Sequence, residues 1–443
     1  MSGLPQGWAQ ASVADVTTPF MSIDPTKTPD KHFRYVDIGS IDNKTQTITD
    51  PKYFLGRDAP SRARRLICTG DTLFSTVRTY LKNIAVVPRE LDGELTSTGI
   101  AVLRPNDAVD AGYLFRWACS DGFVGALSSA QDGTMYPAVS DRDVAVAAIP
   151  LPPLPEQRRI VATIDSIIGK SRRARDELDH IPRLVEKYKQ AVLAAAFRGD
   201  LTRKWREKNS AAAWQSTTLG AVVKIASGQT PKGIETRLSK NGEIPWFKVS
   251  SMNEPDNLAG LRASQFRLSR RDARALGLRI VAAGSIAFPK RGGAIATNKK
   301  RKLLVDGALD LNLMVLTATG ISADFLWWWM QKLDLASISN GSNVPQINNG
   351  DIAPLAIEVP SPPEQAEVAR LLDVAFSWID RLASEATSAH RLIHWLDRAV
   401  LAKAFRGELV PQNPDDEPAS VLLDRIRVER RTVPGPRARR KTA

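Results

Sequence analysis

The sequence has few cysteines and no long apolar segment. Its 443 residues include two cysteines, Cys68 and Cys119, too few for a disulfide framework and, by themselves, too few for a zinc site. No run of eighteen apolar residues occurs, so no segment is predicted to cross a bilayer as a helix. The first residues lack the basic and apolar regions of a secretory signal. These absences favour a cytoplasmic location.

Catalytic signatures are also scarce. Gly169-Lys170-Ser171 looks like the end of a phosphate-binding loop, but Ile164 stands where that loop needs a glycine. No Asn-Pro-Pro-aromatic sequence of amino-methyltransferases, no glycine-rich cofactor loop and no acidic cluster of the nuclease type is found. His390 and His394 share a predicted helical face, without the carboxylate that a metalloprotease helix needs. We therefore predict a binding module with no catalytic residue and no metal site.

Acidic residues are outnumbered by basic ones. The formal net charge is +13 and the pI is about 9.8, which favours a polyanionic partner such as nucleic acid or an anionic membrane. With 43% hydrophobic and 25% charged residues, the composition is that of a globular protein. The length predicts about three domains.

The most informative feature that is present is an internal repeat. Segments 155–201 and 363–409 align without a gap and agree at 17 of 47 positions. Each copy begins with Pro-Glu-Gln, at 155–157 and 363–365, and each ends with Ala-Phe-Arg-Gly, at 196–199 and 404–407. A constant offset over this length indicates duplication.

Both copies are predicted to form long helices. Their apolar residues recur every four and three positions, the heptad pattern of a coiled-coil pair. The seam residues expected between the helices are Ile160, Ile164, Ile167, Leu178, Val185, Val192, Val368, Leu372, Ile379, Leu382, Ile393, Leu396 and Val400. The alternative is that each amphipathic helix lies on its own domain. Pro182 is predicted to kink or interrupt the first helix, whereas its counterpart in the second is His390.

The segments before the two helices contain short alternating apolar runs punctuated by Gly, Pro, Asn and Asp, which predict mixed sheet with few helices. They too match as distant copies: Trp8 corresponds to Trp214, the segment 70–74 to 284–288, and 133–137 to 341–345. The predicted fold class is therefore α+β: two mixed α/β domains (1–154 and 211–362) separated by an antiparallel, pseudo-two-fold symmetric pair of coiled-coil helices (155–200 and 363–409). The tail 425–443, with seven arginines and one lysine against Glu429, is predicted to be disordered.

Polar and basic loops at matching places in the two domains are the candidate DNA contacts, because base edges and phosphates are bound by such side chains. The candidates are Arg78, Tyr80, Lys82, Thr134 and Tyr136 in the first domain, and Lys290, Arg291, Lys299, Lys300, Arg301, Asn343, Gln346 and Asn348 in the second. The alternatives are solvated charged turns and turn-forming residues that bond to local backbone. Trp327-Trp328-Trp329 is interpreted as part of a buried helix rather than as a base-stacking platform.

Several of these motifs together carry a resemblance. They are the twin Pro-Glu-Gln helix starts, each after a proline-rich strand end, the sequence 181–188 leading to Ala-Phe-Arg-Gly, and Trp214 followed by Ser-Gly-Gln-Thr-Pro at 227–231 and Ile-Pro-Trp at 244–246. With them, residues 1–410 resemble the DNA-specificity subunits of type I restriction-modification enzymes. The first domain departs from the pattern, since Thr17-Thr18-Pro19-Phe20 stands where the second has Ser-Gly-Gln-Thr-Pro.

The resemblance implies a division of labour. Each domain would be a target-recognition domain that reads one half of a split, asymmetric site in double-stranded DNA. The helices would set the spacer and dock two methyltransferase subunits that bind S-adenosylmethionine, and restriction subunits using ATP and Mg²⁺ would join them. This chain would bind no cofactor and no membrane, and would catalyse nothing. Two other hypotheses remain open: an autonomous DNA methyltransferase or nuclease with two DNA-reading domains, and a coiled-coil scaffold for RNA or a membrane.

Overall fold

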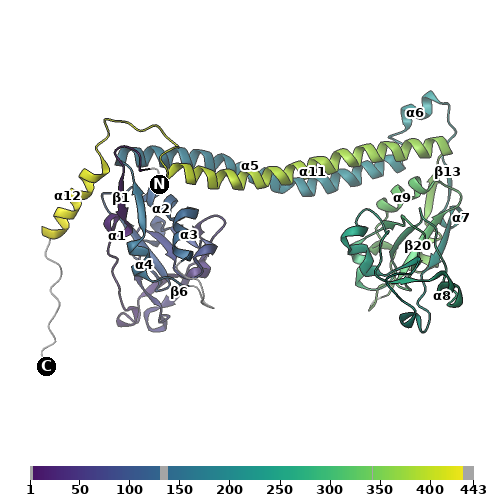
Figure 1. Cartoon of the computed structure of the whole chain (residues 1–443), viewed down its shortest axis with the longest axis horizontal. Helices are drawn as coiled ribbons and strands as arrows, with labels where there is room; N and C mark the ends of the chain where they lie inside the picture. The colour runs from purple at the N-terminus through teal and green to yellow at the C-terminus, as the bar shows by residue number, and fades with distance from the viewer. Residues whose placement is uncertain (1–2, 130–137, 342, 433–443) are drawn as a thin grey trace. The chain divides into compact units, whose positions relative to one another are not determined.

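The fold is described from a computed structural model, which covers residues 3–129, 138–341 and 343–432. The chain divides into two compact units (Figure 1). Unit 1 comprises residues up to Asp179 together with those from Thr387 onward, and unit 2 comprises His180–Ala386. Each of the two long helices therefore begins in one unit and ends in the other.

Unit 1 is built on three main sheets. The first sheet is a pair of antiparallel strands, β1 (Ala9–Ser12) and β12 (Ala148–Leu151). One four-stranded sheet has the order β2 (Thr17–Thr18), β11 (Ile100–Pro105), β8 (Thr72–Ser75), β9 (Ile84–Val86). The other has the order β6 (Lys52–Leu55), β3 (His32–Val36), β10 (Leu95–Ser97), β7 (Ala63–Leu66). A small hairpin, β4 (Ile41–Asp42) with β5 (Thr47–Ile48), is added.

Short helices complete the core of unit 1. They are α1 (Val13–Val16), α2 (Ala111–Ala118), α3 (Asp121–Ser129) and α4 (Asp141–Val146). Fully buried Tyr113 of α2 and Phe74 of β8 belong to one apolar cluster, which also includes Ile160 and Val400 from the two long helices. The core of the domain thus continues into the helix pair.

Unit 2 repeats this plan. Its strand pair is β13 (Gln215–Thr218) with β21 (Ala356–Val359), and its larger sheet has the order β14 (Val223–Ser227), β20 (Leu313–Ala318), β17 (Ile286–Pro289), β18 (Arg301–Lys302). The remaining sheet has the order β16 (Arg267–Leu268), β15 (Ile244–Phe247), β19 (Ala308–Leu309). Its helices are α6 (Arg203–Lys208), α7 (Leu219–Val222), α8 (Arg270–Ala275), α9 (Ala323–Lys332) and α10 (Asn349–Ile352).

The correspondence between the units extends to backbone conformation. In each unit the third sheet contains one parallel pairing, β3 with β10 and β15 with β19. Gly70 and Gly284, which were matched by sequence, both have φ of +86°. The predicted duplication of the two domains is therefore confirmed, and α9, which contains the three tryptophans, is largely buried as predicted, with Trp328 and Trp329 each 7% exposed.

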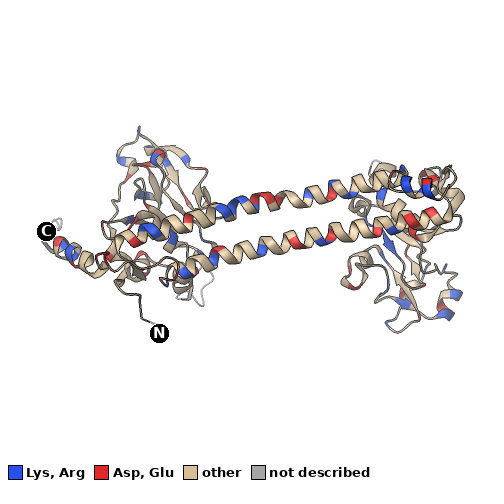
Figure 2. Ribbon diagram, turned by 90° about the horizontal axis from the view of Figure 1, so that it is seen from above, with Lys and Arg blue, Asp and Glu red and all other residues tan. Residues whose placement is uncertain are grey.

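The long helices are α5 (Leu154–Phe197) and α11 (Pro362–Ala404). Within unit 1, Arg175 of α5 pairs with Asp397 of α11, and Asp179 of α5 pairs with His390 of α11. Because residue numbers rise along α5 while those of their partners fall along α11, the parts of the two helices in unit 1 run antiparallel. Within unit 2, Lys189 pairs with Asp380. Figure 2 shows charges of both signs interspersed along the two helices.

Most seam residues are buried or half-buried between the helices and the domains. Ile160, Ile164, Val368, Leu372, Ile379 and Val400 are at most 5% exposed, and Ile167, Leu178, Val185, Val192 and Ile393 are half-buried. Leu382 and Leu396 are exceptions, with exposures of 40% and 42%. Two helices cover only one strip of each other's surface, so positions at the edge of that strip stay open to solvent.

Two expectations about the chain's course were wrong in part: the interruption of the first helix at Pro182, and the disorder of residues 425–432, while residues 433–443 lie outside the described residues. The helix α5 runs through Pro182 without interruption, because the loss of one backbone hydrogen bond is small beside the packing of the neighbouring turns on α11. The tail is not disordered as far as Thr432, because residues 425–432 belong to α12 (Ala419–Thr432). Leu423 of α12 is buried in unit 1, and Arg430 donates to the carbonyls of Ala14 and Thr17.

Candidate nucleic-acid interface

The candidate contacts lie on a turn that follows an interior strand in each unit. In unit 1, β8 leads through Thr76 and Val77 to Arg78, which precedes a 3-10 turn at Thr79–Leu81. In unit 2, β17 leads through Lys290 and Arg291 to Gly292, which precedes a 3-10 turn at Gly293–Thr297. The two turns are related by a constant difference of 214 in residue number, as are Gly70 and Gly284.

A second segment lies beside this turn in both units. The amide of Val139 donates to the carbonyl of Thr76 at 2.9 Å, and the amide of Ile347 donates to the carbonyl of Lys290 at 2.9 Å. Each segment then enters a short helix, α4 or α10. The structure thus brings the two candidate regions of unit 2, around 290 and around 346, onto one surface. Thr134 and Tyr136 lie outside the described residues.

In unit 1 the turn presents one cation and one aromatic ring. Arg78 is exposed and adopts the left-handed conformation, with φ 49° and ψ 56°. Tyr80 is 56% exposed. Lys82 is also left-handed, but its ammonium donates to the carbonyl of Cys119 at 2.9 Å and to Asp121 at 2.6 Å. Lys82 therefore ties the turn to the start of α3, whereas Arg78 and Tyr80 are open to a partner.

In unit 2 the candidates separate into surface and interior groups. Arg291, Asn343 and Asn348 are exposed, and Lys290 and Gln346 are half-buried. The ammonium of Lys290 donates to the hydroxyl of Ser227 at 3.0 Å. The equivalent residues of unit 1 are Thr76 and Val77, which carry no charge. The two units therefore present different chemistry from the same position.

The basic run 299–301 is mostly structural, which corrects the sequence-based prediction for Lys300. Lys300 is 3% exposed, and its ammonium donates to the carbonyl of Leu333 at 2.5 Å and to Asn298 at 2.7 Å. Burial lowers the pKa of Lys300 to about 8. Burial also lowers the pKa of Arg301, which donates to the carbonyl of Lys300. Lys299 donates to Asn253. A basic run in sequence does not show which side chains turn inward.

Sequence reasoning missed the contribution of the Ser-Gly-Gln-Thr-Pro loop to this surface. A Cβ on Gly228 would lie 1.9 Å from the carbonyl oxygen of Asp310, so only glycine allows the loop to approach β19 so closely. The side chain of Gln229 accepts from the amide of Arg279 at 2.6 Å. The loop thereby holds Arg279 next to Lys290, at the edge of the same sheet.

The duplicated Pro-Glu-Gln motif fixes each long helix to its domain. The side-chain oxygen of Gln157 accepts from the amide of Asp110, and that of Gln365 accepts from the amide of Ser322, both at 2.7 Å. Asp110 and Ser322 are the N-caps of α2 and α9. Both glutamines are buried, so the same clamp orients α5 in unit 1 and α11 in unit 2.

The neighbouring glutamates have different partners in the two units. Glu364 accepts from Thr202 at 2.7 Å and from Arg206 at 2.8 Å, and although burial opposes its ionisation, these bonds lower its pKa. Glu156 accepts from the indole of Trp8 at 3.1 Å. Because burial outweighs its hydrogen bonds, the pKa of Glu156 is raised. Glu364 thus forms an ion pair, whereas Glu156 forms none among the described residues, since the nearby Arg159 pairs with Asp416.

The geometry defines a class of protein: a two-domain recognition module in which one scaffold carries two different sets of surface loops. Within the described ranges, no group of three His, Cys, Asp or Glu residues is placed to hold a metal ion. No helix in the part of the chain that is described is long and apolar enough to span a membrane.

Comparison with known proteins gives the family. Residues 212–385 match the type I restriction modification DNA specificity domain. The chain is 25% identical to the type I restriction enzyme StySPI specificity subunit of Salmonella potsdam, covering 99% of both chains. It is 30% identical to the HsdS subunit from Thermoanaerobacter tengcongensis, with a TM-score of 0.70 over 92% of this chain and 98% of the other. A chain from a structure of type I R-M complex assembly and conformational transition is 29% identical, with a TM-score of 0.76 over 92% of this chain and all of the other.

The chain therefore belongs to the family of DNA-specificity subunits of type I restriction-modification enzymes. This agrees with the resemblance carried by the repeated helices. It also disfavours the alternative of an autonomous methyltransferase or nuclease.

Proposed function

We propose that this chain reads a bipartite, asymmetric site in double-stranded DNA, with one half-site for each unit. The observation that carries the proposal is the pair of equivalent turns after β8 and β17, which occupy the same place in the two units but present Arg78 and Tyr80 in one, and Lys290 and Arg291 in the other. Since base edges are distinguished by the side chains that reach them, different side chains on one scaffold would read different sequences.

The long helices would set the distance between the half-sites. At about 1.5 Å per residue, the 44 residues of α5 give a rod of about 66 Å. The clamps made by Gln157 and Gln365 would fix each end of the rod to its domain. A spacer of constant length follows if neither end can turn or slide.

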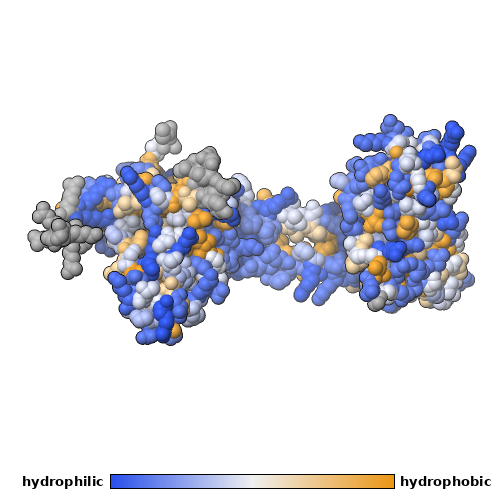
Figure 3. Space-filling model, turned by 90° about the horizontal axis from the view of Figure 1, so that it is seen from below, coloured by the Kyte–Doolittle hydropathy of each residue, from blue (hydrophilic) through white to orange (hydrophobic). Residues whose placement is uncertain are grey.

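Two methyltransferase subunits would dock on the helix pair, one for each unit. In unit 2, an apolar groove of about 260 Å³ is lined by Ile181, Leu184, Val185, Tyr188, Trp378, Ile379, Leu382 and Ala386. In unit 1, Leu392, Trp395 and Leu396 of α11 are between 42% and 67% exposed. Figure 3 shows apolar side chains interrupting the hydrophilic surface of the helices. Exposed apolar patches of this kind are typical of protein interfaces.

The cofactors would be held by the partners. The methyltransferase subunits would bind S-adenosylmethionine and methylate adenine, and restriction subunits using ATP and Mg²⁺ would join them for cleavage. The complex would work in the cytoplasm, where it meets the DNA of the cell, with no role at a membrane.

The test is a competition experiment with the chain assembled with its methyltransferase subunits. Binding to a labelled duplex should survive an excess of RNA and of anionic vesicles and should be lost to unlabelled duplex that contains the target. Equal competition by RNA or vesicles would contradict the proposal. A purified chain that methylates or cuts DNA without partner subunits would instead establish the autonomous enzyme.

A further inference from the structure

Arg65 and Arg279 occupy equivalent positions in the two units. The amide of Gly93 donates to the carbonyl of Ile67 at 2.9 Å, and the amide of Gly307 donates to the carbonyl of Val281 at 3.0 Å. These two bonds, like the paired glycines before β8 and β17, are related by a difference of 214 in residue number. Each arginine stands two residues before the carbonyl partner of this bond, so the two side chains leave the same point of the scaffold.

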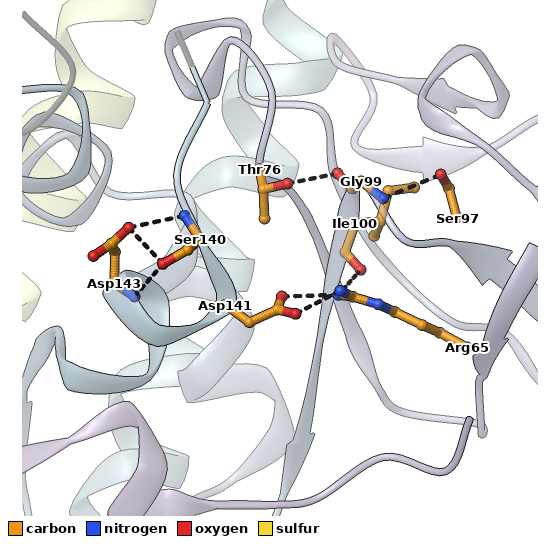
Figure 4. A network of polar contacts seen from close by, with 8 residues as sticks. All are labelled: Arg65, Thr76, Ser97, Gly99, Ile100, Ser140, Asp141 and Asp143. Atoms are coloured by element: carbon orange, nitrogen blue, oxygen red, sulfur yellow. Dashed lines mark hydrogen bonds and ion pairs between the residues drawn. The ribbon is translucent and has the colours of Figure 1, made fainter. Parts of the chain in front are cut away.

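In unit 1 this arginine is an internal clamp. Arg65 is 8% exposed, and its guanidinium donates to both carboxylate oxygens of Asp141, at 2.8 and 2.5 Å, and to the carbonyl of Ile100 at 2.8 Å. Thr76, the counterpart of Lys290, donates to the carbonyl of Gly99 at 2.9 Å. Figure 4 shows both side chains bonded inside the unit. Neither is available to a partner molecule.

In unit 2 the same two positions are positively charged, with Arg279 exposed and Lys290 half-buried. The guanidinium of Arg279 is exposed and donates to the carbonyl of Ser227 at 3.3 Å. The ammonium of Lys290 donates to the hydroxyl of the same serine. At the position of Asp141, related by the offset of 208, unit 2 has neutral Asn349. Among the described residues, neither Arg279 nor Lys290 has a carboxylate within ion-pair distance.

Two cations that converge on one serine repel each other, and a bound anion would relieve that repulsion. Arginine matches the oxygens of a phosphate with its planar fork, and lysine binds phosphate as a point charge. The site lies open beside Arg291, on the surface that carries the other candidate contacts of unit 2, so an extended polyanion suits it better than a small enclosed ligand.

We propose that Arg279 and Lys290 form a contact site for the DNA phosphate backbone that unit 2 has and unit 1 lacks. The inference rests on the proposed DNA-binding function and deepens it. Unit 2 would contribute to affinity through phosphate contacts at this edge, whereas unit 1 has converted the equivalent arginine into part of its fold. Phosphate contacts position a protein on the duplex and do not by themselves select a sequence.

The experiment measures how the dissociation constant depends on salt, for the chain assembled with its methyltransferase subunits. Each phosphate contact contributes about 0.9 to the slope of log K against log salt. Arg279→Gln and Lys290→Gln should therefore each lower that slope by about 0.9 and weaken binding roughly eightfold near 0.1 M salt. The loss should be the same on target and non-target duplexes.

Matched variants make the result specific. Lys204→Gln removes an exposed cation from α6, which Figure 1 shows at the end of unit 2 opposite α8, and should leave the slope unchanged. Arg279→Lys should largely retain the slope, because the charge remains. An unchanged slope in Arg279→Gln, or a loss confined to one base pair of the target, would overturn the proposal. So would stronger competition by inorganic phosphate than by chloride at equal ionic strength, since that indicates a site for a free anion. Failure of the unaltered complex to bind duplex would instead contradict the proposed function itself.

Discussion

The left-handed conformation of Arg78 leads to a prediction in which stability and binding change in opposite directions. For a residue other than glycine, φ 49° and ψ 56° cost about 1–2 kcal/mol. Replacing Arg78 with glycine removes that strain but adds about 0.4–1 kcal/mol of chain entropy to the unfolded state. Since the exposed side chain buries little, Arg78→Gly should leave unit 1 equally stable or more stable by up to about 1.6 kcal/mol.

The same substitution should weaken DNA binding. If Arg78 contacts DNA, its loss should reduce affinity by a factor of roughly ten, in line with about 1–3 kcal/mol for a base contact. Chemical denaturation followed by hydrogen exchange in unit 1 gives the stability, and titration of target duplex by the assembled complex gives the affinity. Destabilisation by more than about 1 kcal/mol would refute the strain argument, and unchanged affinity would refute the DNA contact.

A matched control lies in unit 2. Gly292 has φ 75° and ψ −170°, a combination almost restricted to glycine, and a Cβ there would meet no other atom within 4 Å. Gly292→Ala should therefore cost about 1–3 kcal/mol through backbone strain alone. If Gly292→Ala were as stable as the unaltered chain, the turn must relax, and the positive φ values of Gly292 and Arg78 would not indicate backbone strain.

The remaining predictions concern the helices and their anchors. Because its pKa is lowered below 4.5, Glu364 stabilises the fold when ionised and loses this effect as the pH falls through that lowered pKa, so Glu364→Gln should cost about 1.5–3 kcal/mol at pH 7. The pKa of Glu156 is raised above 4.5, so its protonated form stabilises the fold below the pKa of the unfolded state, and this effect is lost as the pH rises through the pKa of the folded state. Glu156→Gln should therefore be neutral or stabilising at pH 7. Equal losses of stability for Glu364→Gln and Glu156→Gln in urea unfolding curves would contradict both predictions. Inserting seven residues after Asp179 in α5 and seven before Thr387 in α11 should lengthen the tolerated DNA spacer by about three base pairs, since two helical turns add about 10.5 Å. Methylation of targets with varied spacers measures this, and an unchanged optimal spacer would contradict the proposal that the helices set its length. Leu423→Ala should destabilise unit 1 by about 2–4 kcal/mol, measured by local hydrogen exchange, and no effect would mean that α12 is not docked.

The sequence was most informative where the same residues serve the same purpose twice. The Pro-Glu-Gln starts recur because each copy makes the same clamp, as the bonds of Gln157 and Gln365 show. The glycines that end both helices recur because each copy has the same left-handed cap, with φ of 78° at Gly199 and 74° at Gly407. The periodicity of the apolar residues gave the helices for a similar reason: burying one face requires that spacing.

The surface was harder to predict, because exposure depends on contacts between residues far apart in the chain. Lys300 lies in a basic run, yet it is buried, and its ammonium donates to the carbonyl of Leu333. Arg65 and Arg279 share a scaffold position, and the carboxylate of Asp141 that binds Arg65 is replaced in unit 2 by the neutral side chain of Asn349. The docking of α12 was missed because its Arg430 binds backbone carbonyls of unit 1, for which a basic sequence gives no signal.

The central claim is that one unit reads one half-site. Residues 212–362 of this chain should be exchanged for the corresponding segment of a related specificity subunit with a different target, and methylated adenines should be mapped by long-read sequencing in cells that carry the chimera and its methyltransferase. We expect one half of the methylated sequence to change to that of the donor, while the other half and the spacer stay as they were. A methylated sequence that stays the same, or that changes in both halves, would contradict the account.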